Sequence, residues 1–196
     1  MPLTGDRSTN IDKTENFSIT GIKELNNGSN IAGTGFVNGL RSEIDPMKPN
    51  APPYTNAGLS LVGESSAGSL GLTGVHVPNR ANIATASASM HLVNTDTHKL
   101  TANAFSTTVM PKAGPNFATH GGGVDYTYQN TVGANASVSH TPMFKQTDYS
   151  VGGNLNLHQT PTSSLGLNVG ANRTDSPFTG RGNWQPGGSI IFKKSF

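Results

Sequence analysis

The chain has 196 residues, no cysteine, a formal net charge of +2 and only 12% charged residues, against about 25% in an average soluble domain. Glycine, asparagine, serine and threonine supply 85 of its residues. These features exclude a collagen helix, which needs a three-residue glycine period, and a disulfide framework. The thin positive surplus also excludes a nucleic-acid groove, because each neutralised phosphate needs its own lysine or arginine.

Residues 1–56 differ in pattern from the rest of the chain. The polar residues 1–14 are predicted to form a flexible N-terminal arm. Two apolar runs at 17–22 and 31–36 flank an Asn-Asn-Gly-Ser sequence, which is typical of a β-hairpin turn. The proline-rich segment 45–53 resists regular structure and predicts a linker.

A repeat of 65 residues organises the remainder of the chain. Ala57, Gly122 and Gly187 each begin a similar segment, at equal steps along the sequence. Such a period indicates a repeated supersecondary unit. We therefore predict a first glycine-rich repeat over 57–121 and a second over 122–196, the latter including a closing C-terminal strand.

Each repeat shows the two-residue alternation of β-strands. Tyr126 and Tyr128, for example, alternate with Asp125 and Thr127. Clusters of turn residues separate such runs, so each repeat is predicted to contain four short strands. With the hairpin and the closing strand, the chain is predicted to be an all-β, glycine-rich antiparallel meander of about 11 short strands. Closure into a β-barrel would remove exposed edges, and a two-sheet β-sandwich is the alternative.

Several ordered blocks of the second repeat resemble one protein family. They include the Gly-Gly-Val-Asp-Tyr run at 122–126, the block 132–137, the Asn-Leu-Asn-Leu run at 154–157 and the ending with Trp-Gln-Pro at 184–186. These blocks are similar to the C-terminal domain of attacins, the insect glycine-rich antibacterial proteins related to diptericins. The resemblance covers 57–196 well and the hairpin region weakly.

The resemblance implies a secreted haemolymph protein of innate immunity. It further implies action mainly on Gram-negative bacteria, through binding of lipopolysaccharide and disturbance of the outer membrane, with no enzymatic chemistry. The N-terminus lacks the basic and apolar regions of a signal peptide, and no multibasic processing site precedes the repeats. The chain is therefore expected to be a mature region, or to be processed differently from attacin precursors.

Basic and aromatic residues mix near the C-terminus, which suits contact with acyl chains and phosphate groups. Tryptophan prefers the headgroup boundary of a membrane, and cations attract anionic lipid. The candidate residues for contact with lipopolysaccharide or membrane are Arg173, Arg181, Trp184, Lys193 and Lys194. Alternation offers a plainer interpretation of the aromatic residues, in which Ile190, Phe192 and Phe196 pack as one face of a core strand.

Catalytic and metal sites find no support in the sequence. His76 and His140 are equivalent positions of the repeat, but none of the six histidines belongs to a close-spaced metal-binding motif. Serine, histidine and aspartate lack the strand, elbow and helix context of a nucleophile. We predict no catalytic residue, cofactor or metal, and infer no nucleic-acid or protein partner.

Two other functions stay open at this level. An alternating last strand that ends in Phe196 is also found in bacterial outer-membrane β-barrels, although 13 aromatic residues are few for the aromatic girdles of such barrels. A carbohydrate-binding or structural β-protein is the other alternative.

Overall fold

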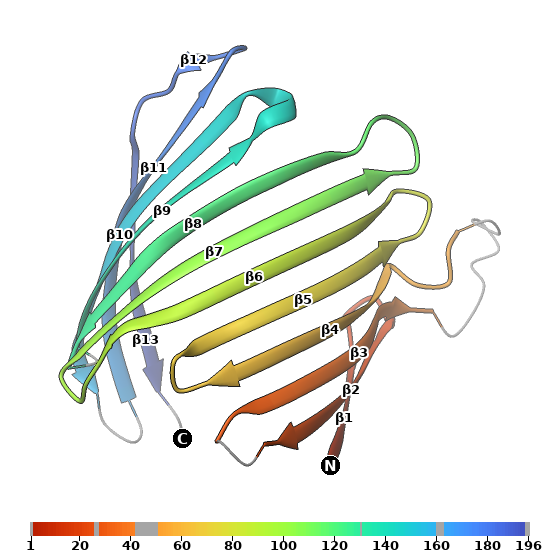
Figure 1. Cartoon of the computed structure of the whole chain (residues 1–196), viewed down its shortest axis with the longest axis horizontal. Helices are drawn as coiled ribbons and strands as arrows, with labels where there is room; N and C mark the ends of the chain where they lie inside the picture. Colours follow the sequence, from red (N-terminus) through yellow and green to blue (C-terminus); the bar gives the residue numbers. More distant parts are fainter. Residues whose placement is uncertain (1, 26–27, 42–50, 130, 160–162, 195–196) are drawn as a thin grey trace. The chain divides into compact units, whose positions relative to one another are not determined.

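In the computed structural model, the chain is antiparallel β-structure with one short 3-10 helix (Figure 1). The structure describes residues 2–25, 28–41, 51–129, 131–159 and 163–194. Its elements are β1 (Leu3–Thr9), β2 (Glu15–Glu24), β3 (Asn30–Leu40), β4 (Asn56–Ser65), β5 (Gly68–Val77), β6 (Ala81–Asn94), β7 (His98–Pro111), β8 (Phe117–Tyr128), β9 (Val132–Thr141), η1 (Pro142–Phe144), β10 (Gln146–Gln159), β11 (Ser163–Ser176), β12 (Gly180–Arg181) and β13 (Gln185–Lys194).

The strands follow one another in chain order from β1 to β12, and β13 pairs with β11. The predicted all-β antiparallel meander is therefore confirmed. Closure into a barrel would require a pairing of the edge strands β1 and β13, and the observed strand order does not include this pairing. The barrel and the sandwich both stay predictions. No helix in the described ranges has the length and apolarity needed to cross a membrane.

The strand β1 corrects the prediction of a flexible arm for residues 3–9. It pairs with β2 from Leu3 opposite Gly21 to Thr9 opposite Glu15. All seven of its residues are exposed, so no apolar alternation marked it in the sequence. Arg7 forms an ion pair with Glu15, and its Cζ lies 5.5 Å from the ring centre of Phe17. These side-chain contacts to β2 supplement the backbone hydrogen bonds between the two strands.

The predicted N-terminal hairpin is present as β2 and β3, which pair antiparallel. Its turn residues Asn26 and Asn27 lie outside the described residues, but Gly28 has a φ of 75°. This backbone conformation favours glycine over residues with a Cβ. Most of the predicted linker, residues 45–50, also lies outside the described part of the chain.

The strands repeat at the spacing found in the sequence. Both ends of β10 lie 65 residues after those of β6, and both ends of β11 lie 65 residues after those of β7. The division into segments 1–56, 57–121 and 122–196 stays a prediction. The chain instead separates into two compact units, which are described individually: unit 1 comprises Met1–Ala88 and Ser106–Ala118, and unit 2 comprises Ser89–Phe105 and Thr119–Phe196.

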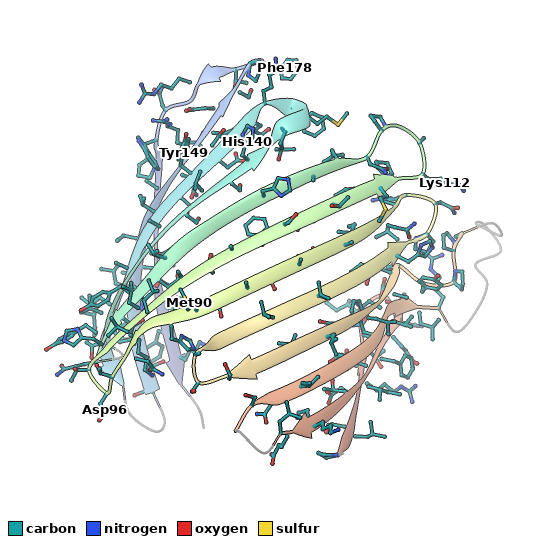
Figure 2. The ribbon with its side chains drawn as sticks, viewed as in Figure 1. Met90, Asp96, Lys112, His140, Tyr149 and Phe178 are labelled. Atoms are coloured by element: carbon teal, nitrogen blue, oxygen red, sulfur yellow. The ribbon has the colours of Figure 1, made fainter. Side chains whose placement is uncertain are left out.

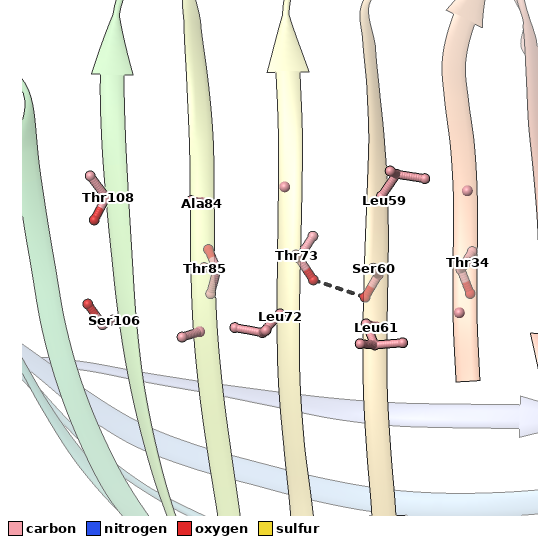
Figure 3. Close-up of a pocket in the computed structure, with 14 residues that line it drawn as sticks. Thr34, Leu59, Ser60, Leu61, Leu72, Thr73, Ala84, Thr85, Ser106 and Thr108 are labelled. Atoms are coloured by element: carbon pink, nitrogen blue, oxygen red, sulfur yellow. Dashed lines mark hydrogen bonds between the residues drawn. The ribbon is translucent and has the colours of Figure 1, made fainter. Parts of the chain in front are cut away.

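Among the described residues, neither unit has a buried hydrophobic side chain. The sheet therefore depends on its backbone ladders and on cross-strand side-chain pairs. In unit 1, hydroxyl pairs join neighbouring strands on one face, and Figure 3 shows the pair of Ser60 and Thr73. These pairs are Thr20 with Thr34 at 2.9 Å, Ser60 with Thr73 at 3.0 Å, and Thr85 with Thr107 at 3.0 Å.

The opposite face of unit 1 carries exposed leucines. Leu59, Leu61, Leu70 and Leu72 are 52–73% exposed, and they alternate with the hydroxyl residues along β4 and β5. The hydroxyl residues of the three pairs are half-buried and are therefore less exposed than these leucines. Unit 1 thus presents apolar side chains to its surroundings, which is the reverse of a water-soluble sheet with one packed face.

Candidate functional site

Unit 2 has one apolar and one polar face. Residues directly opposite each other on antiparallel strands share a face, so the register defines both sets. The apolar face carries Val124, Ala136, Val151 and Ala171 in one row, and Tyr128, Val132, Leu155, Leu167 and Ile190 in another. The polar face carries Asp125, Asn135, Ser137, Ser150, Asn154, Asn168 and Asn172, with Ile191 as an apolar exception.

Glycine makes room for amide side chains on the polar face. A Cβ added at Gly152 would lie 2.6 Å from Asn135 Oδ1, and one added at Gly133 would collide with Asn154 Oδ1. Both asparagines therefore occupy the space that a larger residue on the neighbouring strand would need. The abundance of glycine and asparagine in this chain has a direct structural role at these pairs.

One end of the apolar face is formed by a cluster that we call the arginine rim: Tyr149, Arg173, Asp175 and Trp184. The Arg173 guanidinium donates a 2.6 Å hydrogen bond to Asp175, and its Cζ lies 4.8 Å from the ring centre of Tyr149 and 5.6 Å from that of Trp184. Only 14% of the Arg173 side chain is exposed. Figure 2 shows Tyr149 and His140 at this end of the unit 2 strands and Asp96 at the opposite end.

The arginine rim lowers the pKa of Asp175. The hydrogen bond from Arg173 is the largest cause, the backbone N–H of Gly182 and the charges of Arg173 and Arg181 add to it, and desolvation opposes it. Because the pKa is depressed in the folded chain, the stabilisation is complete above the ordinary aspartate pKa and is lost as pH falls through the folded value.

We expect Arg173→Gln to raise the pKa of Asp175 towards its ordinary value, since the largest cause of the shift is removed. Carboxyl chemical shifts followed through an acid titration measure this pKa in both proteins. Arg181→Gln is the matched control and should raise it less. Equal Asp175 pKa values in the parent chain and in Arg173→Gln would contradict the assignment.

The other end of the apolar face is a cluster that we call the tyrosine rim: His98, Tyr126 and Tyr128. His98 Nδ1 lies 2.8 Å from the Tyr126 hydroxyl, and the ring centres of His98 and Tyr128 are 5.0 Å apart. The sequence pattern does not predict this cluster. It shows the two tyrosines only as part of a strand alternation, and His98 comes from the neighbouring strand β7.

The five predicted contact residues do not form one cluster. Arg173 and Trp184 belong to the arginine rim, and Arg181 lies opposite Asp175 in the register. Lys193 lies on the polar face opposite Ser164, and the backbone of Lys194 lies opposite Ser163. Since a strand rises about 3.4 Å per residue, the backbones of these lysines lie about 31–34 Å along the chain from Trp184 of the arginine rim. Contact of the five residues with lipopolysaccharide stays a prediction.

The last strand alternates as predicted but is not a core strand. Ile190 and Phe192 share the apolar face with Leu167 and Leu165, yet they are 73% and 65% exposed. The predicted packing of these two side chains in a core is therefore wrong, because no second layer covers them among the described residues of unit 2. Phe196 lies outside the described residues.

Other features of the surface offer no set of reactive groups. A hollow of about 670 Å³ in unit 1 is lined by small and hydroxyl residues and by Leu59, Leu61 and Leu72 (Figure 3). His76 Nδ1 lies 2.6 Å from Asn82 Oδ1, and His140 Nδ1 lies 2.9 Å from Thr147 Oγ1. Within the described ranges, no three histidine, aspartate or glutamate residues are grouped to hold a metal ion.

Comparison with solved structures shows a porin-like fold. The chain is similar to an anion-selective porin from Comamonas acidovorans, with a TM-score of 0.61 and 12% sequence identity, over 91% of this chain and 59% of that one. At this identity the likeness concerns the fold alone.

Comparison of sequences shows the family. The family model described as "Attacin, C-terminal region" matches residues 78–196. Attacin-B from Hyalophora cecropia is 42% identical over 64% of this chain and 54% of its own length. Defense protein 3 from Lonomia obliqua and attacin from Bombyx mori are each 39% identical, over 71% and 72% of this chain and 60% and 66% of theirs. The chain spans just over half to two thirds of the length of these relatives, and it belongs to the attacin family.

Proposed function

We propose that this chain is a secreted antibacterial immune effector of the haemolymph. In this proposal it acts mainly on Gram-negative bacteria, by binding lipopolysaccharide and disturbing the outer membrane, without enzymatic chemistry. The observation that carries the proposal is the match of residues 78–196 to the attacin family. The relatives are attacins and a defense protein, which favours this function over the bacterial porin alternative.

The charges of unit 2 support an anionic target. Arg181 is exposed near the arginine rim, and Lys193 is exposed towards the far end of β13. Arg173 already donates a hydrogen bond to Asp175, so its role in the proposed function is to position Trp184 and Tyr149. Exposed cations close to anionic lipid each contribute about 1 kcal/mol of attraction, which gives the modest binding expected of a chain with a net charge of +2.

Growth inhibition of Gram-negative cells, with and without added lipopolysaccharide, tests the proposal. We expect the chain to slow growth and the added lipopolysaccharide to relieve the inhibition by competition. The effect should weaken as salt rises, because exposed charges are screened. Gram-positive cells serve as the control. Inhibition that lipopolysaccharide does not relieve, or binding to defined glycans with no growth defect, would contradict it.

A further inference from the structure

The apolar face of unit 2 is exposed and uncharged between its two rims. Val124, Val138, Val151 and Val169 are 43–55% exposed, although each lies in the middle of a paired strand. Along the described strands of this face, from Tyr149 to Leu155 and from Ala171 to Leu165, no residue carries a charge. A face of this kind in water is costly, at about 25 cal/mol for each Å² of apolar surface.

The two rims that bound this face have the chemistry of a membrane interface. The arginine rim combines a tyrosine, a tryptophan and an ion-paired arginine, and the tyrosine rim combines two tyrosines and a histidine. Aromatic side chains with a polar atom prefer the boundary between hydrocarbon and water. Their concentration at both ends of an apolar band is the girdle pattern of transmembrane strands.

The strands of unit 2 are long enough for this role. β8, β9, β10, β11 and β13 have 10 to 14 residues, whereas a tilted strand needs about 9–11 to cross the hydrocarbon layer. From Arg173 to Leu165, β11 spans eight residues, or about 27 Å along the strand. At a strand tilt of about 40°, this length covers about 21 Å of membrane depth, which is most of the apolar band of outer-membrane barrels, about 25 Å tall.

The face of unit 2 opposite the apolar face is polar, so only one face of its strands is suited to hydrocarbon. Asp125 of β8 lies on the polar face, where Asn103 donates a 2.7 Å hydrogen bond to its carboxylate, and its neighbour Val124 lies on the apolar face. Ser150 and Val151 divide in the same way on β10. Between the two rims, the charged and amide groups thus lie on the face opposite the one that is suited to hydrocarbon.

We propose that the apolar face of unit 2 contacts the acyl chains of a lipid bilayer, with the arginine and tyrosine rims at its two interfaces. The charge distribution, the two aromatic rims and the strand length together identify hydrocarbon as the occupant of this face, and the porin-like fold agrees with it. The inference deepens the proposed function and rests on it, since it states how the outer membrane is disturbed: strands of unit 2 enter the hydrocarbon layer.

The test uses Val151→Arg on the apolar face and Ser150→Arg on the polar face as matched variants of the full chain. Dye release is measured from phosphatidylethanolamine–phosphatidylglycerol vesicles, with and without lipopolysaccharide, and binding to immobilised lipopolysaccharide is measured separately. Circular dichroism verifies the β-structure of both variants, and Val151→Leu controls for a change of side chain that keeps the face apolar.

Val151→Arg is expected to reduce dye release by about tenfold, because an arginine between the interface and the midplane is penalised less than one at the midplane itself, while lipopolysaccharide binding is kept. Ser150→Arg and Val151→Leu should release dye like the parent chain.

Equal release by the two arginine variants would overturn the inference, as would lipopolysaccharide binding without release by the parent. If Val151→Arg altered only the self-association of the chain in solution and left dye release unchanged, the face would be assigned to a second copy of the chain, and the inference would also be overturned. Loss of lipopolysaccharide binding and growth inhibition in the parent, with release from plain vesicles retained, would instead refute the proposed function.

Discussion

Replacing Gly123 with valine is expected to lower the free energy of unfolding by about 1–3 kcal/mol, the typical cost of forcing extra carbons into occupied space. A Cβ at this position would lie 2.6 Å from the carbonyl oxygen of Ala136 and 2.9 Å from the Cβ of Ser137. The first of these atoms belongs to the backbone of β9, directly across the ladder from β8. The added side chain must therefore displace the pairing of the two strands and cannot be accommodated by a change of rotamer alone.

Gly187→Val is the matched control for this prediction. Gly187 also lies on the polar face of unit 2, opposite Gly170, but nothing lies within 4 Å of an added Cβ. Since β-branched residues are favoured in strands, its denaturation midpoint should stay equal to or above that of the parent. Urea unfolding measures both variants, and a lower midpoint with an unchanged slope identifies a loss of stability. Equal midpoints for the two variants would show that the spacing of β8 and β9 does not depend on glycine.

Much of the strand order could be predicted because it is a local property. The two-residue alternation and the turn clusters led to the hairpin of β2 and β3, to four strands in each repeat and to the closing strand β13. Consecutive antiparallel strands joined by short turns pair with their neighbours, so a meander follows directly. The two additional strands, β1 and β12, lack this signal, because β1 is polar and exposed throughout and β12 has two residues.

The candidate site was less predictable because it depends on register. Nearness in sequence predicts that Trp184 and Lys193 belong to one basic-aromatic cluster, yet almost the whole of β13 lies between them. The rims assemble residues from different strands, such as Tyr149 with Arg173 and His98 with Tyr126. Only the pairing of β10 with β11, and of β7 with β8, brings these residues together.

The exposed apolar face also contradicts the expectation that the apolar side chains of the last strand pack in a core, as they do in soluble sheets. In the sequence, the alternation of Ile190 and Phe192 with polar neighbours fits a core strand and a lipid-facing strand equally well, because both have the same period. Burial separates the two possibilities. The large exposed fraction of these side chains, together with the aromatic rims, favours contact with hydrocarbon over contact with a second layer of the same chain.

The depth of a single tryptophan in the membrane tests this central claim most directly. Trp184 is the only tryptophan of the chain, so Trp184→Phe removes the native tryptophan emission, and a new tryptophan can then be placed at position 151 or 150. The two positions are adjacent on β10 but lie on opposite faces. Vesicles whose lipids carry bromine near the end of the acyl chains quench a tryptophan that lies deep in the hydrocarbon.

We expect Val151→Trp, in the Trp184→Phe background, to shift its emission to the blue and to be quenched severalfold by the deep bromines, because residue 151 lies on the apolar face between the rims. Ser150→Trp in the same background should be quenched little. In the parent chain, Trp184 should respond most strongly to bromines near the headgroups. Equal quenching at positions 150 and 151, or no quenching at either while the chain stays bound to the vesicles, would contradict the account.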